Sequence, residues 1–144
     1  MISKSLEETK KIALDFAARM RPHSGGATVV ALSGDLGSGK TTFTKALASA
    51  FGIHEDDITS PTFVIEKRFD IGNQHHFHKF IHIDAYRIED TKEVAKLGWK
   101  ESFADHTNLI VIEWPENLGG ELPKNAIKIS FKFIDENTRE IVFN

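Results

Sequence analysis

The chain lacks several features that define whole classes of protein. None of its 144 residues is cysteine, which excludes disulfide bonds, zinc–thiolate sites and catalysis by a thiol. No apolar run approaches the roughly 18 residues that a membrane-spanning helix needs. The N-terminus also lacks the basic and then apolar pattern of a signal peptide, because charged residues recur along it. We therefore expect a cytoplasmic protein with no membrane partner.

An excess of positive charge is missing as well. Eighteen basic residues stand against 21 acidic ones, for a net charge of −3. A protein that holds nucleic acid by itself needs a basic face to neutralise phosphates. We therefore expect no DNA partner, and any work on RNA would take place within a larger complex. The length fits one domain over residues 1–144, and no repeat, low-complexity tract or linker divides it.

The most informative segment is residues 34–41, with the sequence GDLGSGKT. It is a complete phosphate-binding loop, in which glycines let backbone N–H groups turn towards a phosphate chain. Lys40 would reach the β- and γ-phosphates, and the Thr41 hydroxyl would ligate a magnesium ion. We predict that a nucleoside triphosphate binds here. The loop residues expected to contact it are Asp35, Leu36, Gly37, Ser38, Gly39, Lys40, Thr41 and Thr42.

The segments around the loop predict the fold. Apolar, β-branched residues 27–32 indicate a buried strand before the loop, and apolar residues spaced as on one face of a helix follow it from Phe43 to Phe51. The remaining expected elements are a helix capped at Ser5 that runs to Met20, strands 63–69 and 77–84 as a hairpin, a short helix 91–97 ended by Gly98, a buried strand 109–112, and a closing hairpin of 126–134 with 139–143. Together they predict an α/β, P-loop NTPase-like fold of three layers, with a central mixed sheet flanked by helices.

Two apolar strands each end in an acid, at Asp84 and at Glu113. Ligands of open α/β sheets gather at the carboxyl ends of strands, so both acids could reach the phosphates. One would hold magnesium and the other would orient or activate the attacking water. The pattern does not assign the two roles, and an acid that only ends a strand is the alternative for each. With Lys40, these acids are the predicted catalytic residues.

Other side chains carry weaker signals. Arg87 and Arg139 are candidates for charge stabilisation during phosphoryl transfer, with an ordinary surface position as the alternative. The segment 60–62 could sense the nucleotide or could be a simple proline turn.

A group of histidines and one tryptophan are further candidates for a functional role. The histidines His76, His78 and His82 would share a face of an extended strand. Solvent-exposed histidines on a strand are the favoured interpretation, and a metal site there is the less favoured alternative. We interpret Trp114 as a core or rim aromatic, with stacking or partner contact as the alternative.

Four segments then converge on one family: 34–42 (GDLGSGKTT), 60–63 (SPTF), 82–87 (HIDAYR) and 113–115 (EWP). In this order they closely resemble the TsaE (YjeE) family of small bacterial P-loop ATPases, and the resemblance covers nearly the whole chain. Ala85 departs from the leucine that is typical there, which we interpret as drift without effect on the chemistry.

The resemblance implies a magnesium-dependent ATPase required for threonylcarbamoyladenosine at position 37 of tRNAs that read codons beginning with A. It implies action with a TsaD–TsaB complex, through which the tRNA is met indirectly. ATP would lie in the loop and Mg²⁺ would lie between Thr41 and Glu113. Asp84 would be needed for ATPase activity, and Arg139 would lie near the nucleotide.

Two other functions use the same loop. A small-molecule kinase would need an acceptor pocket and an arginine-rich lid, and the five arginines here are scattered. A GTP-dependent regulatory switch usually carries an Asn-Lys-x-Asp motif, which this chain does not have.

Overall fold

The computed structural model describes residues 1–58, 66–72 and 75–144. The predicted nucleotide-sensing segment 60–62 lies outside these ranges, as does the start of the strand predicted at 63–69. Within the described ranges, no helix is both long enough and apolar enough to cross a membrane.

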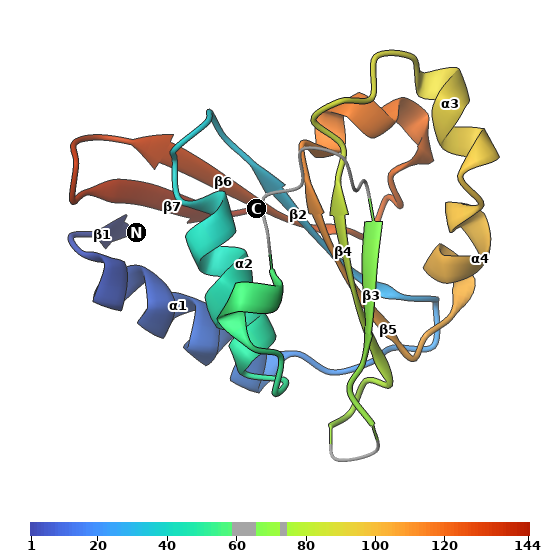
Figure 1. The fold of residues 1–144 in the computed structure, drawn as a ribbon, viewed down its shortest axis with the longest axis horizontal. Helices are drawn as coiled ribbons and strands as arrows, with labels where there is room; N and C mark the ends of the chain where they lie inside the picture. The colour runs from blue at the N-terminus through green and yellow to red at the C-terminus, as the bar shows by residue number, and fades with distance from the viewer. Residues whose placement is uncertain (59–65, 73–74) are drawn as a thin grey trace.

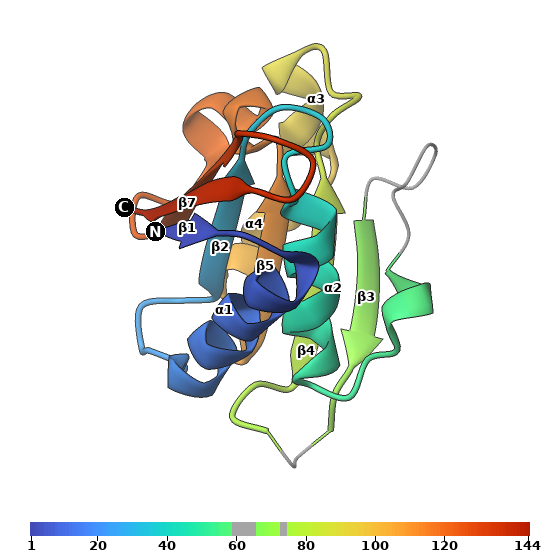
Figure 2. The same cartoon turned by 90° about the vertical axis from the view of Figure 1, so that its left-hand side faces the viewer.

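A mixed sheet of seven strands organises the described residues. Its order is β1 (Ile2–Ser3), β7 (Arg139–Phe143), β6 (Ile127–Phe133), β2 (Thr28–Ser33), β5 (Asn108–Glu113), β4 (Lys79–Asp84) and β3 (Glu66–Asp70). The central strands β6, β2, β5 and β4 run parallel to one another, whereas β3 pairs antiparallel with β4, β7 pairs antiparallel with β6, and β1 pairs antiparallel with β7. Figure 2 shows β1 lying along β7 at one edge. Both predicted hairpins are thus confirmed as antiparallel strand pairs.

Helices cover both faces of this sheet. Helices α1 (Leu6–Arg19) and α2 (Lys40–Ser49) lie on one face, and α3 (Thr91–Lys96) and α4 (Trp99–Ala104) lie on the other (Figure 1). Two 3₁₀ segments, η1 (Glu55–Asp57) and η2 (Pro115–Glu121), connect the larger elements. The predicted three-layer α/β fold is therefore confirmed.

Alternating side chains of the buried strands fill two cores. In β5, Leu109 and Val111 pack in the cluster that includes α1 and α2. Their neighbours Ile110 and Ile112 pack in the cluster that includes Trp99 of α4. All four β5 side chains are fully buried, as expected for a central parallel strand with helices on both sides.

The end of the short helix at 91–97 differs from the prediction. Gly98 does end α3, and with φ 71° it is left-handed, but a second helix starts directly after it. Helix α4 was not predicted because six residues give too short a pattern to show helical periodicity. A tertiary contact holds it: Trp99 is 2% exposed and its indole N–H donates to Glu66 Oε2 on β3 at 2.6 Å. The two-residue strand β1 and segment η2 were not predicted either.

Candidate functional site

The carboxyl ends of three parallel strands meet at one place on the sheet. Glu113, the last residue of β5, pairs in register with Asp84, the last residue of β4, and with Leu32 near the end of β2. The phosphate-binding loop follows β2 and leads into α2 at Lys40. The two predicted acids and the loop therefore come together, as the strand pattern indicated.

The loop backbone depends on glycine. Gly34 has φ 147°, and a Cβ there would lie 2.5 Å from the Phe131 carbonyl oxygen and 2.7 Å from Ser38 Oγ. Gly39 has φ 108° and is the residue before the first turn of α2. The first N–H groups of a helix have no intrahelical partner and carry partial positive charge, so this end of α2 favours an anion.

Lys40 is held inside the site rather than in solvent. Its Nζ donates to the Gly34 carbonyl and lies 3.7 Å from the centroid of the Trp114 ring. Burial lowers the pKa of Lys40, and the charges of Glu113, Glu116, Asp84 and Asp35 oppose that shift. The ammonium therefore lies in a desolvated position from which it can be drawn towards a stronger anionic partner.

Thr41, Glu113 and His82 form a chain of polar contacts. The Thr41 hydroxyl donates to Glu113 Oε1 at 3.4 Å, and Glu113 Oε2 lies 2.6 Å from His82 Nε2. Glu113 is 3% exposed and His82 is 4% exposed. A hydroxyl and a carboxylate oxygen at this distance are hard oxygen donors of the type that Mg²⁺ prefers. The residues present thus fit the predicted ion.

Asp84 lies beside this chain in a half-buried position. Burial raises the pKa of its carboxyl, the charge of Glu113 adds to the rise, and the N–H of Tyr86, which donates to Asp84 Oδ1 at 2.9 Å, opposes it. A carboxylate with a raised pKa in a cleft is a candidate proton acceptor.

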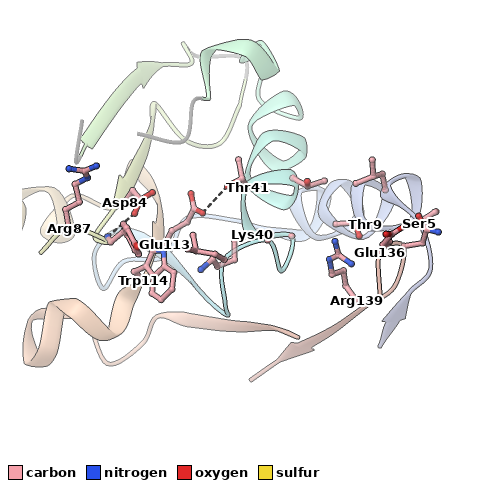
Figure 3. A pocket seen from close by; sticks show the side chains of 17 residues that line it. Ser5, Thr9, Lys40, Thr41, Asp84, Arg87, Glu113, Trp114, Glu136 and Arg139 are labelled. Carbon is pink, nitrogen blue, oxygen red and sulfur yellow. Dashed lines mark hydrogen bonds between the residues drawn. The ribbon is translucent and has the colours of Figure 1, made fainter. Parts of the chain in front are cut away.

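Lys40, Thr41, Asp84 and Glu113 line a pocket with a volume of about 470 Å³. Figure 3 shows Lys40 and Thr41 in its middle, with two groups on opposite sides: Asp84, Arg87, Glu113 and Trp114 on one, and Ser5, Thr9, Glu136 and Arg139 on the other. The structure thus brings both candidate arginines to one pocket. Of the predicted residues, exposed Asp35 and buried Ser38 do not line it; those that do are Leu36, Gly37, Gly39, Lys40, Thr41, Thr42, Asp84, Glu113 and Arg139.

Arg139 lies against the loop. A Cβ added at Gly39 would be 3.7 Å from Cγ and Nε of Arg139. The guanidinium donates to the carbonyls of Asp135 and Thr138 and lies 4.7 Å from the Phe133 ring centroid. Arg139 therefore lines the pocket, and its predicted place near the nucleotide stays a prediction.

One wall of the pocket was missed. Leu6 and Thr9 come from the start of α1, Glu136 and Asn137 come from the β6–β7 turn, and Ser5 was recognised only as a helix cap. Nothing in the local pattern relates these segments to the loop. They are brought there by the antiparallel pairing of β1 with β7, a contact across almost the whole chain.

The reading of the histidines was wrong for His82. His76 and His78 are exposed and precede β4, so they do not share a strand face with His82. His82 is buried and contacts Glu113 instead. Within the described ranges, no group of three or more His, Cys, Asp or Glu side chains is placed to hold a metal ion.

Trp114 has an unusual backbone. Among the described residues it is the only non-glycine residue with positive φ, at φ 59° and ψ 50°. Its ring lies 5.2 Å from that of Tyr86 and against the Lys40 ammonium. Left-handed backbone at a bulky residue is strained and is found where surrounding contacts hold it, often at functional sites. Trp114 is therefore an aromatic residue at the rim of the pocket, which is one of the two positions, core or rim, predicted from the sequence.

A buried parallel strand, a glycine-rich loop and a helix that begins at the loop lysine define the class: this is a P-loop-type α/β domain. Comparison with known proteins then narrows the class. The chain belongs to the TsaE family, because residues 3–141 match the family described as "Threonylcarbamoyl adenosine biosynthesis protein TsaE".

Individual relatives agree with this assignment. Three proteins named "tRNA threonylcarbamoyladenosine biosynthesis protein TsaE" are similar over most of the chain. That of Bacillus subtilis is 39% identical over 95% of this chain and 79% of its own length. Those of Rickettsia bellii (36%, covering 96% and 89%) and Rickettsia felis (34%, covering 96% and 75%) follow. The crystal structure of Bacillus subtilis YdiB is similar with a TM-score of 0.74 at 34% identity, covering 99% of this chain and 82% of that one.

Proposed function

We propose that this chain is a magnesium-dependent ATPase that acts with TsaD and TsaB to form threonylcarbamoyladenosine at position 37 of tRNAs that read codons beginning with A. Membership of the TsaE family supports the coarser part, a role in tRNA threonylcarbamoyladenosine biosynthesis. The ATPase part rests chiefly on one observation: Thr41 and Glu113 are in contact where the phosphate-binding loop ends and α2 begins, with Asp84 beside them.

The protein would bind ATP through its loop. The N–H groups of the loop and of the first turn of α2 would receive the phosphates. Lys40 would exchange the Gly34 carbonyl and the Trp114 ring for the β- and γ-phosphates, which are stronger partners for an ammonium. The pocket side that carries Arg139 and the start of α1 leaves room for the rest of the nucleotide.

Thr41 and Glu113 would hold Mg²⁺, which neutralises phosphate charge when bound. Because Glu113 contacts Thr41 and would hold the ion together with it, we assign Asp84 to the attacking water. Asp84 would orient that water and accept its proton, a role that its raised pKa favours. As the water oxygen bonds to the γ-phosphorus, the bond from that phosphorus to the bridging oxygen breaks and leaves ADP and phosphate. Lys40 and the loop N–H groups would stabilise the charge on the transferred group.

Because the net charge of the chain is negative, we infer that the partner proteins, and not this chain, bind most of the tRNA. The cytoplasm is the expected place of action. ATP hydrolysis would then return the modifying complex to its starting state, as in a switch, rather than convert a metabolite.

Replacement of each acid tests the proposed roles. Asp84→Ala and Glu113→Ala should abolish release of phosphate from ATP while each variant still binds ATP through the intact loop. Glu121→Ala, which removes an exposed acid outside the pocket, is the matched control and should hydrolyse ATP as the wild type does. Unchanged turnover in both Asp84→Ala and Glu113→Ala would contradict the proposal, as would faster transfer of phosphate to a metabolite than to water.

A further inference from the structure

His82 is a buried histidine that the proposed mechanism does not use. It lies on β4 two residues before Asp84 and is 4% exposed. Its Nε2 is 2.6 Å from Glu113 Oε2, whereas the other carboxylate oxygen, Oε1, faces the Thr41 hydroxyl at 3.4 Å. Figure 3 shows the Thr41 contact as a dashed line. The two oxygens of Glu113 therefore have different partners from different elements.

Burial makes these partners necessary. A carboxylate with 3% exposure loses most of its hydration, and each of its oxygens needs a hydrogen-bond donor in the protein. Thr41 lines the pocket, where its hydroxyl is expected to turn to the ion. His82 does not line the pocket and comes from the neighbouring parallel strand. A contact to His82 can therefore persist while the ligand side of Glu113 changes.

The geometry points to His82 as the positioning residue of Glu113. By donating Nε2–H to Oε2, the imidazole fixes the rotation of the carboxylate and leaves Oε1 directed at Thr41. The ion then meets an oxygen that is already oriented. Partners that hold a ligating side chain in this way typically contribute 10–100-fold to metal affinity. This inference rests on the proposed function, because it takes Glu113 as a ligand.

Three substitutions at His82 separate positioning from packing. In His82→Gln the amide nitrogen can occupy the place of Nε2, in His82→Asn the shorter side chain places it where Nδ1 was, and His82→Leu has no donor. Ile81→Val is the control, since Ile81 is fully buried on the same strand and packs in the opposite core. It loses packing without touching Glu113.

The measurement is Mn²⁺ affinity for the complex of the full chain with the non-hydrolysable analogue AMPPNP, read by electron paramagnetic resonance. Affinity for AMPPNP in EDTA and thermal stability are measured alongside. We expect His82→Leu and His82→Asn to bind Mn²⁺ about ten-fold or more weakly, and His82→Gln and Ile81→Val to bind it as the wild type does. Metal-free AMPPNP affinity should not change.

Equal Mn²⁺ affinity in wild type and His82→Leu would overturn the inference, as would losses in all variants that only follow their stability. A wild type that binds no Mn²⁺ with AMPPNP would overturn the proposed function, and this inference with it.

A second measurement needs only one folded variant. The ring nitrogens of His82 in the wild-type chain are observed by long-range ¹H–¹⁵N correlation, with His82→Gln to assign them. We expect a proton on Nε2. An unprotonated Nε2 would mean that Glu113 is not held as a carboxylate by this ring, and would overturn the inference even if His82→Leu and His82→Asn fail to fold.

Discussion

Replacing Gly34 and Gly37 with alanine should have very different costs, although both glycines belong to the phosphate-binding loop. Gly37 has φ 78° and an added Cβ would meet nothing within 4 Å. Gly34 has φ 147°, and its Cβ would lie 2.5 Å from the backbone oxygen of Phe131. The first substitution tests backbone strain alone, and the second adds a collision with β6.

The magnitudes follow from these contacts. Left-handed backbone costs a non-glycine residue about 1–2 kcal/mol, and the lower entropy of the unfolded alanine chain returns about 0.4–1 kcal/mol. Gly37→Ala should therefore lower the free energy of unfolding by about 1 kcal/mol. Forcing an extra methyl into a packed position costs a further 1–3 kcal/mol or so, because the Phe131 carbonyl cannot rotate away as a side chain would. Gly34→Ala should lose about 3 kcal/mol.

Scanning calorimetry and urea unfolding of the nucleotide-free protein measure the difference. In a chain of this length 1 kcal/mol corresponds to roughly 2–4 °C in Tm, so we expect drops of about 3 °C for Gly37→Ala and about 10 °C for Gly34→Ala. Equal losses in the two variants, or a larger loss at Gly37, would refute the reasoning that the loop is seated against β6.

Substitutions at three positions test the site and its supports. Asp84→Asn should stabilise the nucleotide-free protein at pH 7, because the raised pKa of Asp84 means that folding disfavours its charged form. In urea titrations the gain should shrink as the pH falls through the raised pKa, and it should vanish below the ordinary pKa that Asp84 has in the unfolded chain. A gain that grows at low pH would contradict this sign. Ser5→Ala should cost about 1 kcal/mol of unfolding free energy and Ser5→Asp much less, since Ser5 Oγ accepts from the Glu8 N–H at 3.1 Å; equal losses would exclude the cap. Trp114→Gly should be more stable than Trp114→Ala by about 1 kcal/mol in the free energy of unfolding, because φ is 59° at this position. It should therefore also unfold at a higher temperature. The reverse order would show that the backbone there is not strained.

Sequence patterns predicted those parts of the site that are local in the chain. The glycine spacing of the loop, the helix after it and the acids that end β4 and β5 each show within a few residues. Parallel pairing then brings Asp84 opposite Glu113 by the ordinary geometry of α/β sheets. The three-layer architecture was predictable for the same reason.

Contacts between distant segments could not be predicted in this way. The pocket wall that contains Ser5 depends on β1, a strand of two residues that has no periodicity and forms only because β7 lies beside it. Helix α4 is short and depends on the burial of Trp99. Alternation along β4 places His82 on the face of Asp84. The register with β5 sets Val111 directly opposite His82, so the diagonal contact of His82 with Glu113 could not be predicted from the strand pattern.

The most direct test of the proposed function is phosphate release from ATP with magnesium, measured for the chain alone, with purified TsaD–TsaB, and with TsaD–TsaB and tRNA. Asp84→Ala is measured in parallel. We predict slow turnover by the chain alone, faster turnover when the partners are present, and none in the variant. High turnover that is indifferent to the partners would contradict the assignment to the tRNA-modifying complex, and undiminished turnover by Asp84→Ala would contradict the proposed chemistry.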